Sequence, residues 1–112
     1  MKKKFRIKKN EEIQQLLKEK NTVGNNYFVI YHKKDHEAKN FRFAIAVSKK
    51  YGKAHERNLM KRRIREVVKL NYFKENVEFF IIAKLKSKPL NFEKIKVNLE
   101  ELFKQAQLLK ER

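Results

Sequence analysis

The chain has 112 residues, of which 30 are Lys or Arg and 13 are Asp or Glu, so its formal net charge is +17. This length supports one hydrophobic core, which predicts a single domain over residues 1–112. A hydrophobic fraction of 41% with only two Gly and one Pro excludes a disordered basic tail, and the absence of Cys excludes disulfides and thiolate metal sites. No apolar run approaches the roughly 20 residues that span a bilayer, so we expect a soluble cytoplasmic protein without a membrane partner.

The N-terminal half predicts a helix followed by strands. Asn10 is a candidate N-cap for a helix that runs to about Lys20 with an apolar face at Ile13, Leu16 and Leu17. Residues 21–26 predict a turn or a short irregular strand, and residues 27–32 a strand rich in β-favouring side chains. Residues 33–40 are polar and predict a hairpin loop, and residues 41–47 alternate as in a strand with one buried face.

The C-terminal half predicts helix, strand and helix. A basic connection over residues 49–53 leads into a basic helix over residues 54–70. Residues 77–83 are almost continuously apolar, which is typical of a central strand covered on both faces. The last 20 or so residues repeat apolar side chains from Phe92 to Leu109 at three- and four-residue steps, which predicts an amphipathic helix capped by Asn91. The pattern indicates an α+β fold, and the strand-helix-strand unit would ordinarily be right-handed.

The basic helix is the most informative segment, because six of the thirteen residues from Arg57 to Lys69 are basic. On a helix, one stripe gathers the apolar residues Met60, Ile64, Val67 and Val68. The adjoining stripe carries Asn58, Lys61, Arg62, Arg65 and Lys69. An ordinary solvated face mixes both signs of charge, whereas Glu56 and Glu66 are the only acids here. This stripe therefore favours phosphate binding and a nucleic-acid partner.

Two neighbouring segments supply further candidates. Ser48, Lys49 and Lys50 leave the alternating strand just before the helix and either join its basic surface or form a plain charged loop. The aromatic residues of the strand at 27–32 are either core residues or stacking platforms for unpaired bases, and the two faces of a strand allow only one set to be displayed.

Catalytic and metal-binding constellations are not evident. The three His residues, His32, His36 and His55, are scattered, and neither a carboxylate cluster nor a Gly-rich phosphate loop is visible. We therefore predict no catalytic or metal-ligating side chains, so any reaction belongs to a partner.

An ordered set of short motifs points to one family. The helix opens with Arg57-Asn58 and continues through Lys61-Arg62 to Ile64-Arg65, and the segment Ala44–Lys50 precedes it at matching spacing. This set resembles the protein component of bacterial ribonuclease P. Residues 8–13 and 27–31 also fit, so the resemblance spans nearly the whole chain.

The resemblance implies a four-stranded sheet covered by three helices in the order α-β-β-β-α-β-α, with a left-handed strand-helix-strand crossover. It also implies a subunit of a bacterial ribonucleoprotein endonuclease, a hydrolase that matures tRNA by removing the 5′ leader of precursor tRNA. In this family a large catalytic RNA performs the reaction with magnesium ions that the RNA mainly binds. The protein binds that RNA and the single-stranded leader, and no obligate protein partner is inferred.

The resemblance also implies two sets of contact residues. Those for the catalytic RNA are Lys49, Lys50, Arg57, Asn58, Lys61, Arg62, Arg65 and Lys69. Those for a leader cleft between the sheet and the first helix are Ile13, Leu17, Tyr31 and Ser48.

The sequence departs from the family pattern at a few positions. Leu59 stands where the family usually has Arg, and we expect Arg63, one turn further on, to take over part of that role. Lys53 stands where Asn is common. Ile13 and Leu17 are aliphatic where aromatic residues are frequent, which leaves Tyr31 as the main candidate for base stacking.

Two other functions fit the charge of the chain. A non-enzymatic RNA-binding module, such as a ribosomal-protein-like or RNA-chaperone domain, would bind structured RNA without promoting leader cleavage. A membrane-surface or antimicrobial protein is disfavoured by the predicted strands and covered core.

Overall fold

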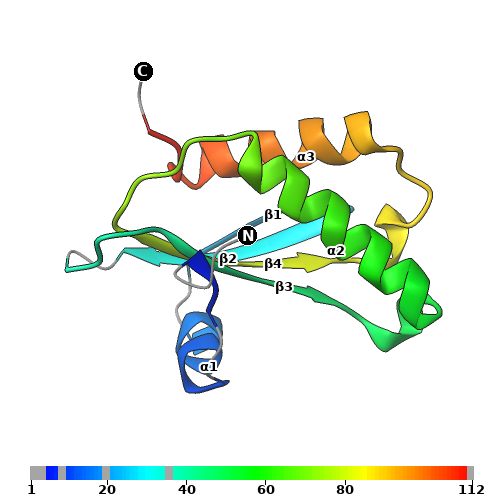
Figure 1. Ribbon diagram of the computed structural model, residues 1–112, viewed down its shortest axis with the longest axis horizontal. Helices are drawn as coiled ribbons and strands as arrows, with labels where there is room; N and C mark the ends of the chain where they lie inside the picture. Colours follow the sequence, from blue (N-terminus) through cyan, green and yellow to red (C-terminus); the bar gives the residue numbers. More distant parts are fainter. Residues whose placement is uncertain (1–4, 8–9, 19–20, 35–36, 111–112) are drawn as a thin grey trace.

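The computed structural model describes residues 5–7, 10–18, 21–34 and 37–110. These residues form one sheet and three α-helices, which confirms the predicted α+β fold and element order. The elements are α1 (Asn10–Lys18), β1 (Thr22–Gly24), β2 (Phe28–Lys34), β3 (Arg42–Val47), α2 (Ala54–Lys69), β4 (Val77–Ala83) and α3 (Phe92–Gln105). Helices α2 and α3 lie together on one face of the sheet, and α1 lies on the other (Figure 1).

The strands are arranged in the order β1-β2-β4-β3. Strand β4 is antiparallel to β2 and parallel to β3, so it separates these two strands. The predicted hairpin over residues 33–40 is therefore wrong, and Lys33 and Lys34 belong to β2 itself. The strand that is apolar on both faces takes the interior of the sheet, because only there are both faces covered.

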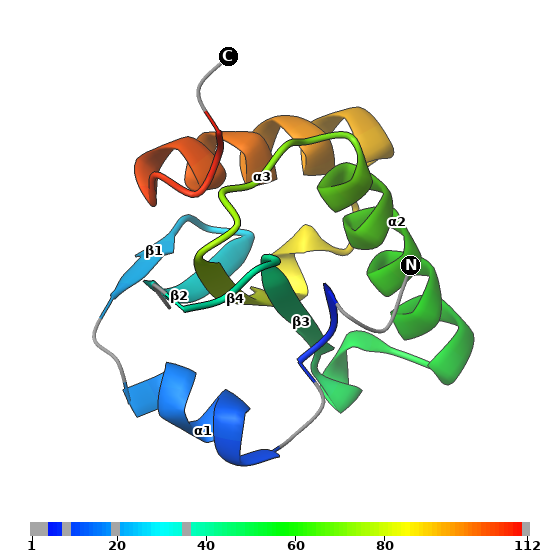
Figure 2. The same cartoon turned by 60° about the vertical axis from the view of Figure 1, so that its left-hand side comes forward.

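The connection from β3 through α2 to β4 is left-handed. Figure 2 shows β3 and β4 from their amino-terminal side, with α2 above and to the right of β3, and with β4 to the left of β3. A chain that moves to the left while it turns through α2 in this way forms a left-handed crossover. This confirms the handedness implied by the family resemblance rather than the one that is usual for such units.

Two apolar clusters lie on the two faces of the sheet. The main cluster lies under α2 and α3 and includes Phe28, Phe79 and Phe103, all fully buried. The smaller cluster lies under α1 and consists of Ile7, Leu16 and Phe80, with partly buried neighbours that include Ile13, Tyr31, Ala44 and Ala46. Strand β4 contributes to both clusters, as its apolar sequence predicts.

A buried carboxylate interrupts the apolar face under α1. Glu78 in β4 is only 4% exposed, and its register partners are Lys33 in β2 and Arg42 in β3. Both cations lie 3.6 Å from its carboxylate oxygens. A buried charge is tolerated when it is paired in this way, so Glu78 sits where both neighbouring strands present a cation.

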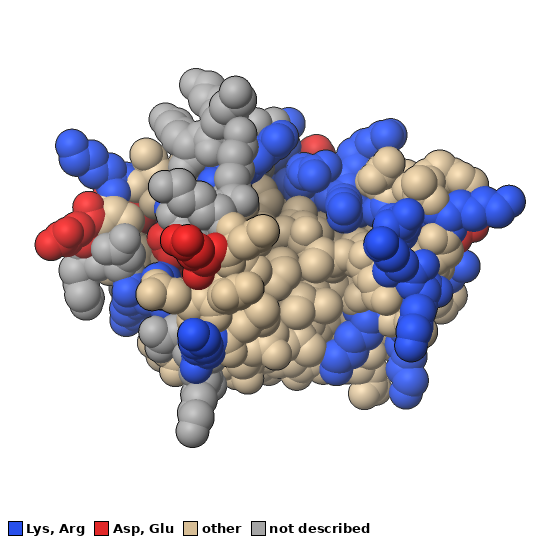
Figure 3. All heavy atoms as spheres, turned by 90° about the horizontal axis from the view of Figure 1, so that it is seen from below, with Lys and Arg blue, Asp and Glu red and all other residues tan. Residues whose placement is uncertain are grey.

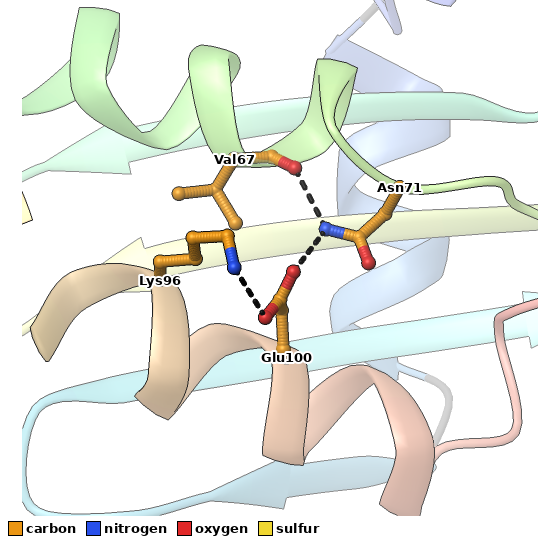
Figure 4. A network of polar contacts seen from close by, with 4 residues as sticks. All are labelled: Val67, Asn71, Lys96 and Glu100. Atoms are coloured by element: carbon orange, nitrogen blue, oxygen red, sulfur yellow. Dashed lines mark hydrogen bonds and ion pairs between the residues drawn. The ribbon is translucent and has the colours of Figure 1, made fainter. Parts of the chain in front are cut away.

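A polar network joins the end of α2 to α3 (Figure 4). The side-chain amide of Asn71 donates to the carbonyl oxygen of Val67 at 2.9 Å and to Oε2 of Glu100 at 2.8 Å. Lys96 donates to the other oxygen of Glu100 at 3.3 Å. The network fixes the direction of α2 on α3.

The helix ends differ somewhat from expectation. The Asn91 cap is confirmed, because its side chain accepts from the backbone N–H of Lys94 at 2.9 Å. Helix α3 nevertheless ends at Gln105, whereas the sequence predicts a helix to Leu109. Gln107 has a φ of 57°, and Leu109 instead pairs with Phe73 in an isolated bridge. Helix α1 ends at Lys18, and the predicted extension to Lys20 lies outside the described residues.

Candidate RNA-binding site

Helix α2 presents its basic residues on a rigid support. Met60, Ile64, Val67 and Val68 are at most 2% exposed and anchor the helix over β3 and against α3, as the sequence predicts. The basic stripe lies at the surface: Asn58, Arg62 and Lys69 are exposed, and Arg57, Lys61 and Arg65 are partly buried. The Nε of Arg57 is buried and has no hydrogen-bond partner among the described residues, so the ends of the other basic side chains of the stripe are better placed to reach a partner.

The approach to α2 is built from the end of β3. Ser48 caps a 3₁₀ turn over Lys49–Tyr51, and its hydroxyl accepts from the backbone N–H of Lys50 at 3.1 Å. Ser48, Lys49 and Lys50 are all exposed. The capped turn therefore holds both lysines at the surface where β3 ends.

A pocket of about 360 Å³ lies along the outer edge of β3. Ile13 of α1, Ala44 and Ala46 of β3 and Phe80 of β4 contribute apolar surface. Arg65 reaches the same pocket from α2. The structure thus brings together one residue from each predicted set, Ile13 from the leader cleft and Arg65 from the basic helix.

The other predicted cleft residues do not line this pocket. Tyr31 is half-buried and packs in the same cluster as Ile13, under α1. Leu17 is 43% exposed and, like Ser48, does not line the pocket. Of the four predicted cleft residues, Ile13 alone lines the pocket, and Tyr31 packs in the same cluster as Ile13 under α1.

Two further lysines, which the sequence analysis did not single out, follow β4 at the end of the sheet where Lys49 and Lys50 follow β3. Val47 and Ala83 are register partners at the ends of the parallel strands β3 and β4, so the residues that follow them are neighbours. Lys84 and Lys86 follow β4, and both are exposed. Figure 3 shows Lys and Arg side chains gathered at the right-hand end of the molecule, where these strands end, beside a largely uncharged sheet surface. Parallel pairing of the two strands was the missing signal.

An ion pair connects the first turn of α2 to the segment after β4. Nζ of Lys88 lies 3.1 Å from Oε2 of Glu56. The hydrogen bond and charge of Lys88 hold the pKa of Glu56 below its usual value. The carboxylate faces Gly52, where an added Cβ would overlap Oε2 of Glu56. This contact fixes how α2 begins relative to the lysines after β4.

The histidines occupy separate places. His32 lies in β2, where burial and then the charge of Lys34 lower its pKa, and His55 is exposed at the start of α2. His36 lies outside the described residues. Within the described ranges, no three His, Asp or Glu side chains gather as they would around a metal ion.

The helices of the described residues are all too short or too polar to cross a membrane.

A basic helix held rigidly beside an apolar sheet surface places this α+β chain in the class of small RNA-binding proteins. The comparison with known families is more specific: the chain belongs to the ribonuclease P protein family, whose model matches residues 1–107.

Similar proteins cover almost the whole chain. The ribonuclease P protein component of Phytoplasma australiense is 39% identical over 111 residues, which are 97% of this chain and 96% of that protein. The solved RNase P protein of Staphylococcus aureus is 35% identical with a TM-score of 0.87, covering 95% of this chain and 98% of that one. The RNase P protein of Thermotoga maritima is 26% identical with a TM-score of 0.80, covering 89% and 96%. The two solved structures share the fold described above.

Proposed function

We propose that this chain is the protein subunit of a bacterial ribonuclease P and assists removal of the 5′ leader from precursor tRNA in the cytoplasm. The observation that carries the proposal is the pocket at the edge of β3, where apolar Ile13 and cationic Arg65 meet. A single-stranded RNA needs both an apolar surface for its bases and cations for its phosphates. Both kinds of side chain line this pocket.

The basic stripe of α2 suggests which residues bind the catalytic RNA. The outer stripe, with Lys61, Arg62 and Lys69, contacts phosphates of the catalytic RNA, and Lys49 and Lys50 extend this contact toward the end of β3. In this proposal the RNA binds most of the magnesium ions and also supplies the catalytic groups. Neutralised phosphates repel one another less, so the RNA folds and binds its ions at lower magnesium concentration.

The leader contact explains how the protein favours binding of precursor tRNA over binding of mature tRNA. A 5′ leader that passes over Ile13 and Tyr31 is present in the precursor and absent from the mature tRNA. The protein therefore strengthens precursor binding without strengthening product binding, so product release is not slowed.

The decisive experiment is cleavage of a 5′-extended precursor tRNA by a bacterial ribonuclease P RNA at low magnesium, with and without the protein. We expect strong stimulation that declines as the leader is shortened. Tight, salt-sensitive RNA binding without stimulation would instead identify a general RNA-binding module.

The basic face of α2 is tested by K61A/R62A/R65A. Removing three phosphate contacts should lower affinity for the catalytic RNA and reduce the slope of log K against log salt by about 2–3. The matched control is K94A/K96A/K104A, which removes the same charge from α3. If both triple variants weaken binding equally, net charge rather than the face of α2 determines affinity.

A further inference from the structure

A second pocket, of about 310 Å³, lies on the other side of α2 near its first two turns. Tyr51, Leu59 and Met60 provide apolar lining, Glu56, Arg63 and Lys88 provide charged groups, and His55 completes the lining. Its volume is at the lower end of the range of about 300–1,000 Å³ in which proteins bind small organic groups. None of these residues lines the pocket at the edge of β3.

Leu59 is the feature of this pocket that the phosphate-binding role of α2 leaves unexplained. It is 41% exposed on a helix whose other surface residues are mainly basic. Tyr51 and Met60, by contrast, are 3% and 2% exposed and form the floor. Leu59 therefore extends the apolar wall of the pocket out to the surface.

The charges around the pocket restrict what it can hold. Arg63 and Lys88 make the surroundings cationic, as in the rest of this strongly basic chain, so an anionic polymer is attracted to the surface. Inside the pocket, however, Lys88 is already paired with Glu56 at 3.1 Å. The carboxylate and the apolar walls disfavour a phosphate in the pocket itself. The complementary ligand is an apolar ring with polar edges, attached to phosphates that remain outside.

We propose that this pocket receives one unstacked nucleobase of the RNA that α2 binds, with a flanking phosphate on Arg63. The proposal rests on the proposed RNA-binding function of α2. The ring would lie against Leu59 with Tyr51 and Met60 below it, beside Lys88, whose Nζ lies 6.0 Å from the centre of the Tyr51 ring. Because the pKa of Glu56 is lowered, its carboxylate is ionised and acts only as an acceptor. It therefore favours the amino group of cytosine, whereas the N3–H donor of uracil lies between two carbonyl oxygens that repel a carboxylate.

The first test compares two exposed leucines at opposite ends of α2. Leu59→Ala removes the apolar wall without changing charge or weakening the helix, and Leu70→Ala is the matched control, since Leu70 is 50% exposed and lies outside the pocket. We expect Leu59→Ala to weaken binding of a bacterial ribonuclease P RNA about tenfold with the same salt slope, as for loss of a base contact. Leu70→Ala should bind like the parent protein.

Binding by the two variants distinguishes the base pocket from the RNA-binding face of α2. Unchanged binding by Leu59→Ala, together with weakened binding by K61A/R62A/R65A, would overturn the base pocket and leave the RNA-binding face intact. Unchanged binding by both variants would overturn the proposed function itself. Thermal unfolding of each variant verifies that the comparison is made between folded proteins.

The second test uses small probes and NMR of the Leu59 and Met60 methyl groups. CMP should shift these signals at lower concentration than UMP, which has the same ring size but a carbonyl in place of the amino group. Ribose 5-phosphate, which has no base, should leave them unchanged. Equal shifts with ribose 5-phosphate would show a phosphate site and overturn the proposal. In Glu56→Gln, the preference for CMP over UMP should disappear.

Discussion

At the scale of single residues, Gly52 links backbone conformation to charge arrangement. Its φ of 150° lies in a region that L side chains rarely adopt, and its missing Cβ leaves space for the carboxylate of Glu56. The carboxylate can therefore reach Lys88. One glycine thus allows both the turn into α2 and the ion pair that orients it.

Replacing Gly52 with Ala should destabilise the protein by about 1–3 kcal/mol, because the backbone is strained and Glu56 must move away from Lys88. Gly24→Ala is the control, since Gly24 has no positive φ and its added Cβ would lie 3.2 Å from the nearest atom, the carbonyl oxygen of Phe28. Urea unfolding of both variants measures the difference. Equal destabilisation would show that Gly52 has no special role.

The candidate site could be predicted from sequence only in part. The stripe from Arg57 to Lys69 follows from helical periodicity, which depends on local geometry alone. The meeting of Ile13 with Arg65 could not be predicted, because it depends on how α1 docks across the sheet. The family resemblance supplied the cleft residues but gave no sign that Leu17, Tyr31 and Ser48 lie outside the pocket.

At the scale of elements, the orientation of α2 depends on Asn71, which bridges Val67 and Glu100. Its contact with Glu100 is partly buried and charge-assisted, and such hydrogen bonds contribute more than exposed ones. Lys96 contacts the same carboxylate as an i,i+4 pair within α3. The two neighbours of Glu100 therefore make unequal contributions.

Asn71→Ala should lower the free energy of unfolding by about 1–2 kcal/mol, because the bridge between the helices is lost. Lys96→Ala should lower it by only about 0.3–0.5 kcal/mol, the usual value for an i,i+4 ion pair. Denaturant unfolding measures both. A larger effect for Lys96→Ala would contradict the bridging role of Asn71.

The elements were easier to predict than their pairing. Alternation and apolar runs identify β3 and β4, but they carry no information on which strand is the neighbour of which. For this reason the hairpin over residues 33–40 was wrong, and the position of Lys84 and Lys86 at the same end of the sheet as Lys49 was missed. The end of α3 was misplaced because Ala106 and Leu109 keep a helical spacing although the helix ends at Gln105.

At the scale of the whole molecule, a net charge of +17 on 112 residues opposes the compact state. Lys49, Lys50, Lys84 and Lys86 are all exposed and follow the adjacent ends of the parallel strands β3 and β4, so their charges add to this repulsion. A multivalent anion that binds there stabilises the folded state by mass action, in addition to general screening. The stability of the free protein should thus depend on which anion is present.

Millimolar pyrophosphate should raise the Tm more than sodium chloride at equal ionic strength. A site filled at ten times its Kd contributes about 1.4 kcal/mol, and each kcal/mol raises the Tm of a domain of this size by roughly 4–8 °C. Millimolar concentrations keep the general exclusion effect of such anions small. The variant K49A/K86A should lose much of this gain while starting from a higher Tm in low salt, because part of the repulsion is gone. Lys84 is kept, since its Nζ donates to the carbonyl oxygen of Asn25 at 2.7 Å. Equal Tm values in pyrophosphate and chloride would show that the lysines respond to screening alone.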